Sequence, residues 1–270
     1  MEILSYSFFQ NALLGVLFVS IAAGIIGTYV VSRRMVFITG GITHACFGGL
    51  GLGFFLGINP IAMAAVFAIA AATGVEWMST RQNVRQDSAI GVIWALGMAL
   101  GTLFIFLSPG YVPELNSFLF GNILTVTVSD LIVFAAYTLV LAVVFACFFN
   151  LIVACAFDRD FARVAGLPVK TVSTVMTVMT ALCIVLTIRL VGIMLLMSML
   201  SLPMMIAETF THSLRKLIVS SALISLVASL AGLFAGALVD VPCSALIVMI
   251  LAALFLLART AKAFLRSVRA

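Results

Sequence analysis

The stretch SRRMVFITGGITHACFGG, residues 32–49, joins a pair of arginines to a long apolar run. Such a run predicts a membrane-spanning helix whose basic end stays outside the lipid. His44 lies inside the run, and the only other histidine of the sequence is His212. An ionisable side chain at that depth is costly unless it has a partner or faces water, so His44 is a candidate functional residue.

Composition places the whole chain in a membrane. Its 270 residues are 64% hydrophobic and only 9% charged, and the mean hydropathy is +1.33. A soluble domain of this size could not solvate such a surface. The five cysteines form no CxxC motif, which argues against a disulfide framework and against a structural zinc site. The first residues lack the basic start of a signal peptide, and we expect the first hydrophobic run to stay in the mature protein.

Hydropathy predicts an all-α integral membrane protein, a polytopic helical bundle of about 8–9 transmembrane helices, because a crossing needs about 20 apolar residues. Nine segments reach about that length. They cover residues 8–31, 36–57, 60–78, 89–108, 129–156, 171–188, 190–207, 217–239 and 242–258. No linker divides them, so we expect a single membrane domain over residues 1–270. Glycines four residues apart, such as Gly49 and Gly53, predict close helix packing.

The basic residues orient these spans. With nine spans, every lysine and arginine except Arg189 falls on one side of the membrane. The positive-inside rule places that side in the cytoplasm, with the N-terminus outside and the C-terminus inside. The net charge of +5 follows from this bias and from contact with anionic membrane lipid, and it requires no nucleic-acid partner.

Residues 157–168, FDRDFARVAGLP, form a distinctive loop on the basic side. Asp158 is a suitable N-cap for a short helix, and Gly166 with the proline after Leu167 stops it after about two turns. Phe161 and Leu167 contribute to an apolar side of this helix. The segment is either a docking surface for another protein or a solvated connector.

Several segments, taken in order and with their spacing, resemble one family: the membrane permease subunits of ATP-binding-cassette importers for zinc, manganese and iron. The segments are Arg33–Gly49, Asp87–Gly91, Leu119–Leu124, Phe157–Pro168, Val191–Leu196 with Leu202–Pro203, and Ala231–Leu233 with Asp240–Pro242. The resemblance covers most of the chain, residues 13–258. It implies the importer permease fold, with a cytoplasmic coupling helix at residues 157–168.

The resemblance also implies a set of partners. Family members work as two permeases, here a homodimer, with two cytosolic ATPases and an extracytoplasmic metal-binding protein, in the bacterial plasma (inner) membrane. This chain would be a transport subunit, not an enzyme, without a bound cofactor and with a divalent metal (zinc, manganese or iron) as cargo. The sequence has no GxxxxGK[ST] motif, so the partner would hydrolyse the ATP. The implied contacts to the ATPase are Asp158, Asp160, Phe161, Arg163, Gly166 and Leu167.

In this family an aspartate typically precedes the histidine of the second span by one helical turn, so that both could bind one divalent cation. In this sequence that position is Gly40. Three interpretations of His44 remain: a transient metal ligand in a water-filled path, a gate residue hydrogen-bonded to Thr43 or to a backbone carbonyl, or a buried structural histidine. The resemblance favours a path or gate role, supported by Thr43 and Gly40.

Two other features bear on a metal path. Pro203 lies deep in a predicted span, where it should kink the helix and free polar groups that line a cavity. Glu208 and His212, four residues apart at a predicted helix end, form either a second metal site or a hydrogen-bonded pair. The sequence does not choose the metal, although the missing carboxylate slightly favours zinc.

Other functions fit the sequence less well. A permease for a siderophore or a corrinoid usually has a longer chain with more spans. An ion-coupled secondary carrier usually needs acidic residues at mid-membrane, where this sequence has few. An intramembrane enzyme needs a catalytic pair at depth, and only His44 is available there.

Overall fold

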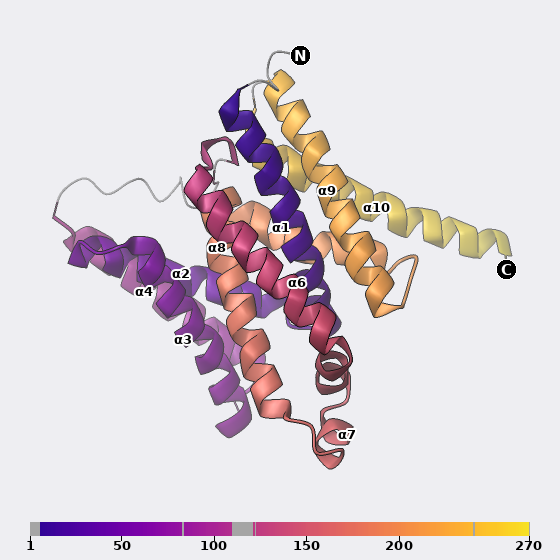
Figure 1. Cartoon of the computed structure of the whole chain (residues 1–270), viewed down its shortest axis with the longest axis horizontal. Helices are drawn as coiled ribbons and strands as arrows, with labels where there is room; N and C mark the ends of the chain where they lie inside the picture. The colour runs from indigo at the N-terminus through magenta and orange to yellow at the C-terminus, as the bar shows by residue number, and fades with distance from the viewer. Residues whose placement is uncertain (1–5, 83, 110–120, 122, 240, 270) are drawn as a thin grey trace. The chain divides into compact units, whose positions relative to one another are not determined.

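The computed structural model describes residues 6–82, 84–109, 121, 123–239 and 241–269. These residues form helices and connecting turns with no strand among them, which confirms the all-α prediction (Figure 1). Eight of the described helices are long and apolar enough to cross a membrane. The elements are α1 (Ser7–Ser32), α2 (Val36–Leu56), α3 (Pro60–Arg81), α4 (Gln86–Leu107), η2 (Ile123–Thr125), α6 (Val128–Phe157), α7 (Arg159–Val164), α8 (Val169–Ala207), α9 (Leu214–Val239) and α10 (Cys243–Arg269).

The structure joins two of the nine predicted spans in one element that is broken at a single residue. The segments 171–188 and 190–207 both belong to α8, and Arg189 lies inside this helix rather than in a loop. The helix is interrupted at Gly192, whose backbone has φ 81° and ψ 172°. Because glycine has no Cβ, it tolerates this conformation, and the helix resumes without a loop. The backbone therefore leaves helical geometry at Gly192, whereas Pro203 lies inside the helix, and the kink expected at Pro203 stays a prediction.

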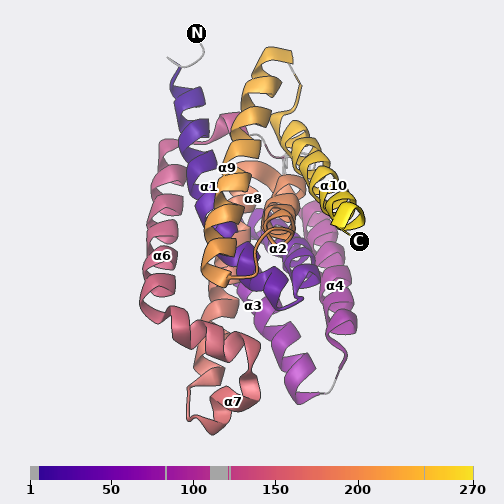
Figure 2. The ribbon, with the colours of Figure 1, turned by 90° about the vertical axis from the view of Figure 1, so that its right-hand side faces the viewer.

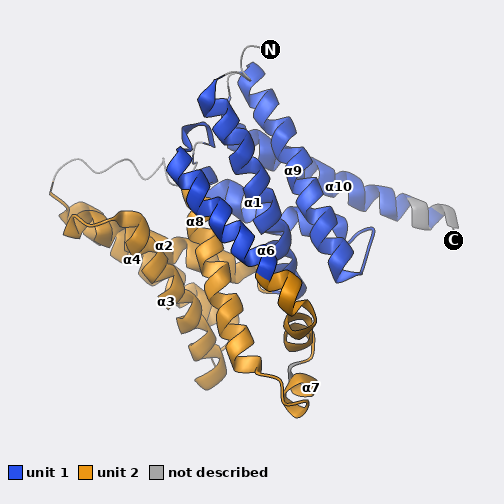
Figure 3. Cartoon of the chain, viewed as in Figure 1, with its two compact units in different colours: residues 1–34, 116–143, 190–270 blue, residues 35–115, 144–189 orange. Residues whose placement is uncertain are grey.

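The chain forms two compact units, which are coloured separately in Figure 3. The first unit comprises residues 1–34, 116–143 and 190–270, and the second comprises residues 35–115 and 144–189. Helices α6 and α8 contribute to both units. The expectation of a single membrane domain over residues 1–270 stays a prediction.

In the second unit, glycines bring α2 into backbone contact with α3 and α4. A Cβ at Gly49 of α2 would lie 2.4 Å from the Met63 carbonyl oxygen of α3. A Cβ at Gly97 of α4 would lie 2.5 Å from the Cα of Ala45 of α2. Helices approach this closely in lipid where the facing residues are small. The close packing expected from the glycine spacing is confirmed, and it fixes where α2 presents its side chains.

In the first unit, α1 and α9 lie side by side and run antiparallel (Figure 2). Near the start of α1, the ring of Phe9 packs against the ring of Phe234, with centroids 5.4 Å apart. Further along α1, a Cβ at Gly24 would lie only 2.6 Å from the Cβ of Ala222. Residue numbers rise along one helix as they fall along the other, which fixes the direction of both.

One end of the first unit gathers basic residues. An apolar cluster joins three helix ends there: Val31 of α1, Met204 and Ala207 of α8, and Leu214 and Leu217 of α9. The basic residues next to this cluster in sequence are Arg33, Arg34, Arg215 and Lys216. Lys262 of α10 joins the same end, because its Nζ donates a hydrogen bond of 2.7 Å to the Thr209 carbonyl oxygen. The start of α1 lies at the opposite end of this unit.

Candidate functional site

His44 lies on α2, half-buried against α4. Its imidazole stacks on the indole of Trp94, with ring centroids 4.1 Å apart and planes inclined by 12°. Its Nδ1 atom lies 3.2 Å from the sulfur of Met98, to which it donates a hydrogen bond in the tautomer that carries the proton there. The contact of Gly97 with the backbone of His44 and Ala45 holds the two helices at this separation. The site therefore offers one imidazole nitrogen and one thioether sulfur.

The two residues expected to support His44 contribute little to its side chain. Thr43 is buried, and its hydroxyl donates a 2.6 Å hydrogen bond to the Thr39 carbonyl oxygen, one turn earlier on α2. The described partners of the imidazole are instead Met98 and Trp94. Gly40 is buried one turn before His44 and offers no ligand atom. The path or gate role of these residues stays a prediction.

The interruption of α8 coincides with a close backbone approach. Gly121 has φ 58°, and a Cβ there would lie 2.3 Å from the Gly192 nitrogen and 2.4 Å from the Val191 carbonyl carbon. Two segments named in the sequence analysis, Leu119–Leu124 and Val191–Leu196, thus meet in the first unit. Residues 119, 120 and 122 lie outside the described part of the chain, as does Asp240. Pro203 is buried in α8.

The proposed pair of Glu208 and His212 lacks the helix on which it depended. Helix α8 ends at Ala207, Glu208 belongs to the following turn, and His212 lies in an irregular segment. Both residues are exposed, and their spacing does not place them on one helical face. Among the described residues, no three or more His, Cys, Asp or Glu side chains gather as a metal site. The metal role of the pair stays a prediction, now without its geometric basis.

Glu76 is a further polar residue, outside the motifs of the sequence that indicate a site. It lies inside α3, where its Oε1 accepts a 2.5 Å hydrogen bond from the hydroxyl of Ser173 and its Oε2 accepts one of 3.2 Å from Thr177. Both hydroxyls belong to the first turns of α8, one helical turn apart. The carboxyl group thus ties α3 to the start of α8. An acidic residue inside an apolar run is a visible signal, of the same kind as His44.

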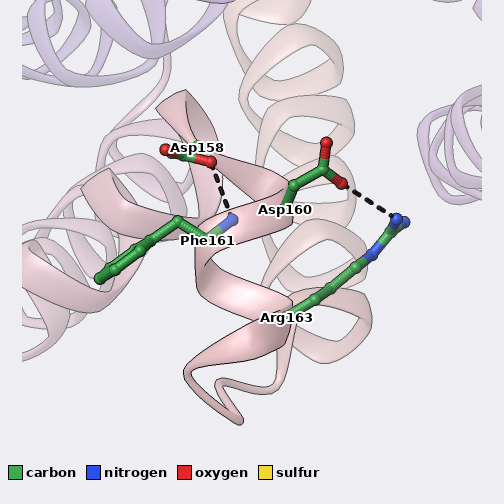
Figure 4. A network of polar contacts seen from close by, with 4 residues as sticks. All are labelled: Asp158, Asp160, Phe161 and Arg163. Carbon is green, nitrogen blue, oxygen red and sulfur yellow. Dashed lines mark hydrogen bonds and ion pairs between the residues drawn. The ribbon is translucent and has the colours of Figure 1, made fainter.

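Helix α7 begins as expected at Asp158 (Figure 4). The Oδ1 atom of Asp158 accepts a hydrogen bond of 2.8 Å from the backbone N–H of Phe161, which caps the helix. Asp160 and Arg163 form an ion pair of 3.5 Å on the surface. An exposed pair of this kind adds little stability. The N-cap is therefore the contact that defines where α7 starts.

The end of α7 is a Schellman motif. Gly166 has φ 73°, and its N–H donates a hydrogen bond to the Arg163 carbonyl oxygen. The N–H of Leu167 donates a hydrogen bond to the Ala162 carbonyl oxygen, which completes the motif. Ala162 and Leu167 also belong to an apolar cluster that holds the short helix against the end of α6 and the start of α8. The other members of this cluster are Leu151, Cys155, Val169 and Val172.

The opposite side of α7 is apolar and open. The exposed fraction is 63% for Phe161 and 90% for Val164. In Figure 4 the ring of Phe161 points away from the Asp160–Arg163 pair. The predicted short helix is thus confirmed, with one apolar side anchored in the second unit and another presented outward. Its role in docking stays a prediction.

Comparison with known proteins agrees with this architecture. The sequence matches the model of the ABC 3 transport family over residues 5–262. It is 33% identical to a probable metal transport system membrane protein of Chlamydia trachomatis, over 86% of this chain and 81% of that protein. It is 29% identical to the manganese transport system membrane protein MntC of Halalkalibacterium halodurans, over 95% of this chain and 88% of that protein.

The fold is similar to a solved structure. PsaBC from Streptococcus pneumoniae, in complex with Fab, contains a chain that superposes with a TM-score of 0.84 at 30% sequence identity. The superposition covers 95% of this chain and 92% of that one. The family model, the curated relatives and this structure each cover most of the sequence, and the chain belongs to the ABC 3 transport family.

Proposed function

We propose that this chain is the membrane-spanning permease subunit of an ATP-binding-cassette importer that moves a divalent transition metal into the cytoplasm. The observation that carries the proposal is α7, a capped and anchored helix that presents Phe161 and Val164 outward. The sequence has no phosphate-binding motif, so ATP must act through another protein. Helix α7 is suited to transmit that action to α6 and α8.

The cargo is a divalent metal. The curated relatives are named as metal and manganese transport proteins, which favours a metal over a siderophore or a corrinoid. His44 supplies an imidazole, a ligand that suits several first-row transition metals. We place His44 on the metal path, with Gly40 and Thr43 beside it on α2. Pro203 on α8 is a supporting position.

The working unit contains further proteins. We infer a homodimer of this permease, two cytosolic ATPase subunits that dock on α7, and an extracytoplasmic metal-binding protein that delivers the cargo. The chain itself binds no cofactor and catalyses no reaction. Metal moves as the two permeases alternate between outward and inward access, and the weak ligands of the path allow its release.

The charges support an orientation in a bacterial inner membrane. By the positive-inside rule, the basic end of the first unit and the loop that carries α7 face the cytoplasm, and the N-terminus lies outside. Both ends of α8 then lie on the cytoplasmic side. At 39 residues the helix would be about 58 Å long if straight, about twice the thickness of the hydrocarbon core. We therefore place a reversal of chain direction at Gly192, which puts the C-terminus in the cytoplasm although eight of the described helices are candidate spans.

Elemental analysis of cells tests this function. Deleting the gene in its host, together with redundant importers, should lower the cellular content of one metal among zinc, manganese and iron during growth in chelated medium. The wild-type gene should restore that metal, and His44→Ala should not. Unchanged contents of all three metals in the deletion strain would contradict the proposal.

A further inference from the structure

One nitrogen and one sulfur atom meet where α2 and α4 touch. We propose that His44 Nδ1 and Met98 Sδ together form a transient metal site on the path, and that this site favours zinc over manganese. The inference rests on the proposed function, because it concerns the cargo of that path. It also predicts a metal different from the one in the names of the manganese relatives.

The geometry needs little adjustment to hold an ion. With a zinc–nitrogen distance of about 2.0–2.1 Å, a tetrahedral angle and the zinc–thiolate distance of about 2.3 Å as the lower bound for a thioether, the two ligand atoms lie at least about 3.5 Å apart. In the structure, His44 Nδ1 and Met98 Sδ lie 3.2 Å apart. A shift of a few tenths of an ångström, within reach of the flexible methionine side chain, would open the site. The imidazole then carries its proton on Nε2 and binds the metal through Nδ1.

The surroundings hold the imidazole in place. Trp94 stacks on the ring at 4.1 Å, which restricts its rotation about the side-chain bonds. Gly97, next to Met98, is in contact with the backbone of His44 and Ala45, so the two ligands are held by helices that touch. Trp94 is thus a positioning residue for the ligand pair. The ring is also half-buried, which limits the water that competes for the metal.

Ligand chemistry sets the preference. Thioethers are soft ligands and imidazole suits zinc, whereas manganese prefers carboxylate, carbonyl and water oxygens. The position one turn before His44 is Gly40, so α2 supplies no carboxylate there. A site with one thioether and one imidazole therefore binds zinc better than manganese. Two neutral protein ligands also bind weakly enough for a transported ion to leave.

Titration of the purified full-length permease with zinc alone and with manganese alone tests the site. Removing a residue that only supports a metal ligand typically weakens metal binding by about 10–100-fold. Met98 is proposed as a ligand itself, so Met98→Leu should weaken zinc binding by about tenfold or more. Leucine conserves the volume of methionine, so the fold should survive. Manganese binding, already weaker, should change little. Met249→Leu, at an exposed methionine of α10, is the matched control and should bind like the wild type.

X-ray absorption at the zinc edge gives an independent readout. Zinc-loaded wild-type protein should show a sulfur neighbour that Met98→Leu lacks and Met249→Leu retains. Equal zinc affinity in the wild type and Met98→Leu would overturn the inference. The same sulfur neighbour of zinc in both proteins would also overturn it. Tighter binding of manganese than of zinc by the wild type would also overturn it.

Uptake by the complete importer separates this inference from the proposed function. In vesicles with the ATPase and the binding protein, Met98→Leu should lower zinc uptake relative to manganese uptake by about tenfold. An unchanged ratio in an active importer would overturn the site alone. No uptake of either metal or of iron by the wild type would contradict the proposed function itself.

Discussion

Replacing Gly97 by alanine tests the contact that positions His44. A Cβ at residue 97 would lie 2.5 Å from the Cα of Ala45 and 2.7 Å from the carbonyl oxygen of His44. The first distance is about 1 Å shorter than van der Waals contact between two carbon atoms. Because both neighbours are backbone atoms, no side-chain rotation relieves the clash, and α2 must move away from α4.

The size of the effect follows from a matched pair of variants on α4. Gly91→Ala adds the same methyl group to the same helix, and nothing lies within 4 Å of it. Each alanine gains about 0.8–1.0 kcal/mol of helix propensity over glycine. Overpacking a close contact costs about 1–3 kcal/mol. The free energy of unfolding of Gly97→Ala should therefore lie about 1–3 kcal/mol below that of Gly91→Ala.

Unfolding in detergent measures this difference, and metal uptake measures its consequence. Gly91→Ala should be at least as stable as the wild type and fully active. Gly97→Ala should be less stable and should lose uptake, because the movement of α2 separates His44 from Met98 and Trp94. Equal stability of the two variants would refute the backbone contact between α2 and α4, and with it the geometry of the site.

Three more perturbations concern helix α7 and the start of α8. Glu76→Ala leaves two hydroxyls of α8 without their acceptor and should lower the free energy of unfolding by about 1–3 kcal/mol. Glu76→Gln keeps an acceptor and should lower it less. Equal losses in the two variants would argue against the hydrogen bonds. Asp158→Ala removes a cap worth about 0.5–2 kcal/mol and should speed amide exchange in α7, whereas Asp158→Asn should not. Phe161→Ala should weaken ATPase binding by about tenfold or more without changing stability, whereas Phe264→Ala, with a similar exposed fraction of 69%, should leave binding unchanged.

Local rules were enough to predict the helices and the ends of α7. Long apolar runs predict spans because the backbone in lipid must satisfy its own hydrogen bonds. Asp158 and Gly166 predict where α7 starts and stops because each makes its capping contact within a few residues. The sequence was misleading around Arg189, where a charged residue suggested a loop. A glycine in an apolar run can break a helix or continue it, and here Gly192 breaks the helical geometry at the point where Gly121 approaches it.

Contacts between distant segments could not be predicted. Met98 lies 54 positions from His44, and Ser173 lies 97 positions from Glu76. Nothing local to His44 indicates that a methionine of another helix faces it. The pairing depends on how closely two helices approach, which is a property of the packed unit. For the same reason, the expected partner Thr43 was next in sequence, yet its hydroxyl bonds its own helix backbone.

Metal uptake by a reconstituted importer tests the central claim most directly. Vesicles that contain this chain with its ATPase and its binding protein, and that enclose a metal-sensitive dye, would be mixed with zinc, manganese or iron. We expect one of these metals to enter when ATP is supplied to the ATPase, and we expect no uptake when this chain is omitted. Failure of all three metals to enter, or equal uptake in vesicles that lack this chain, would contradict it.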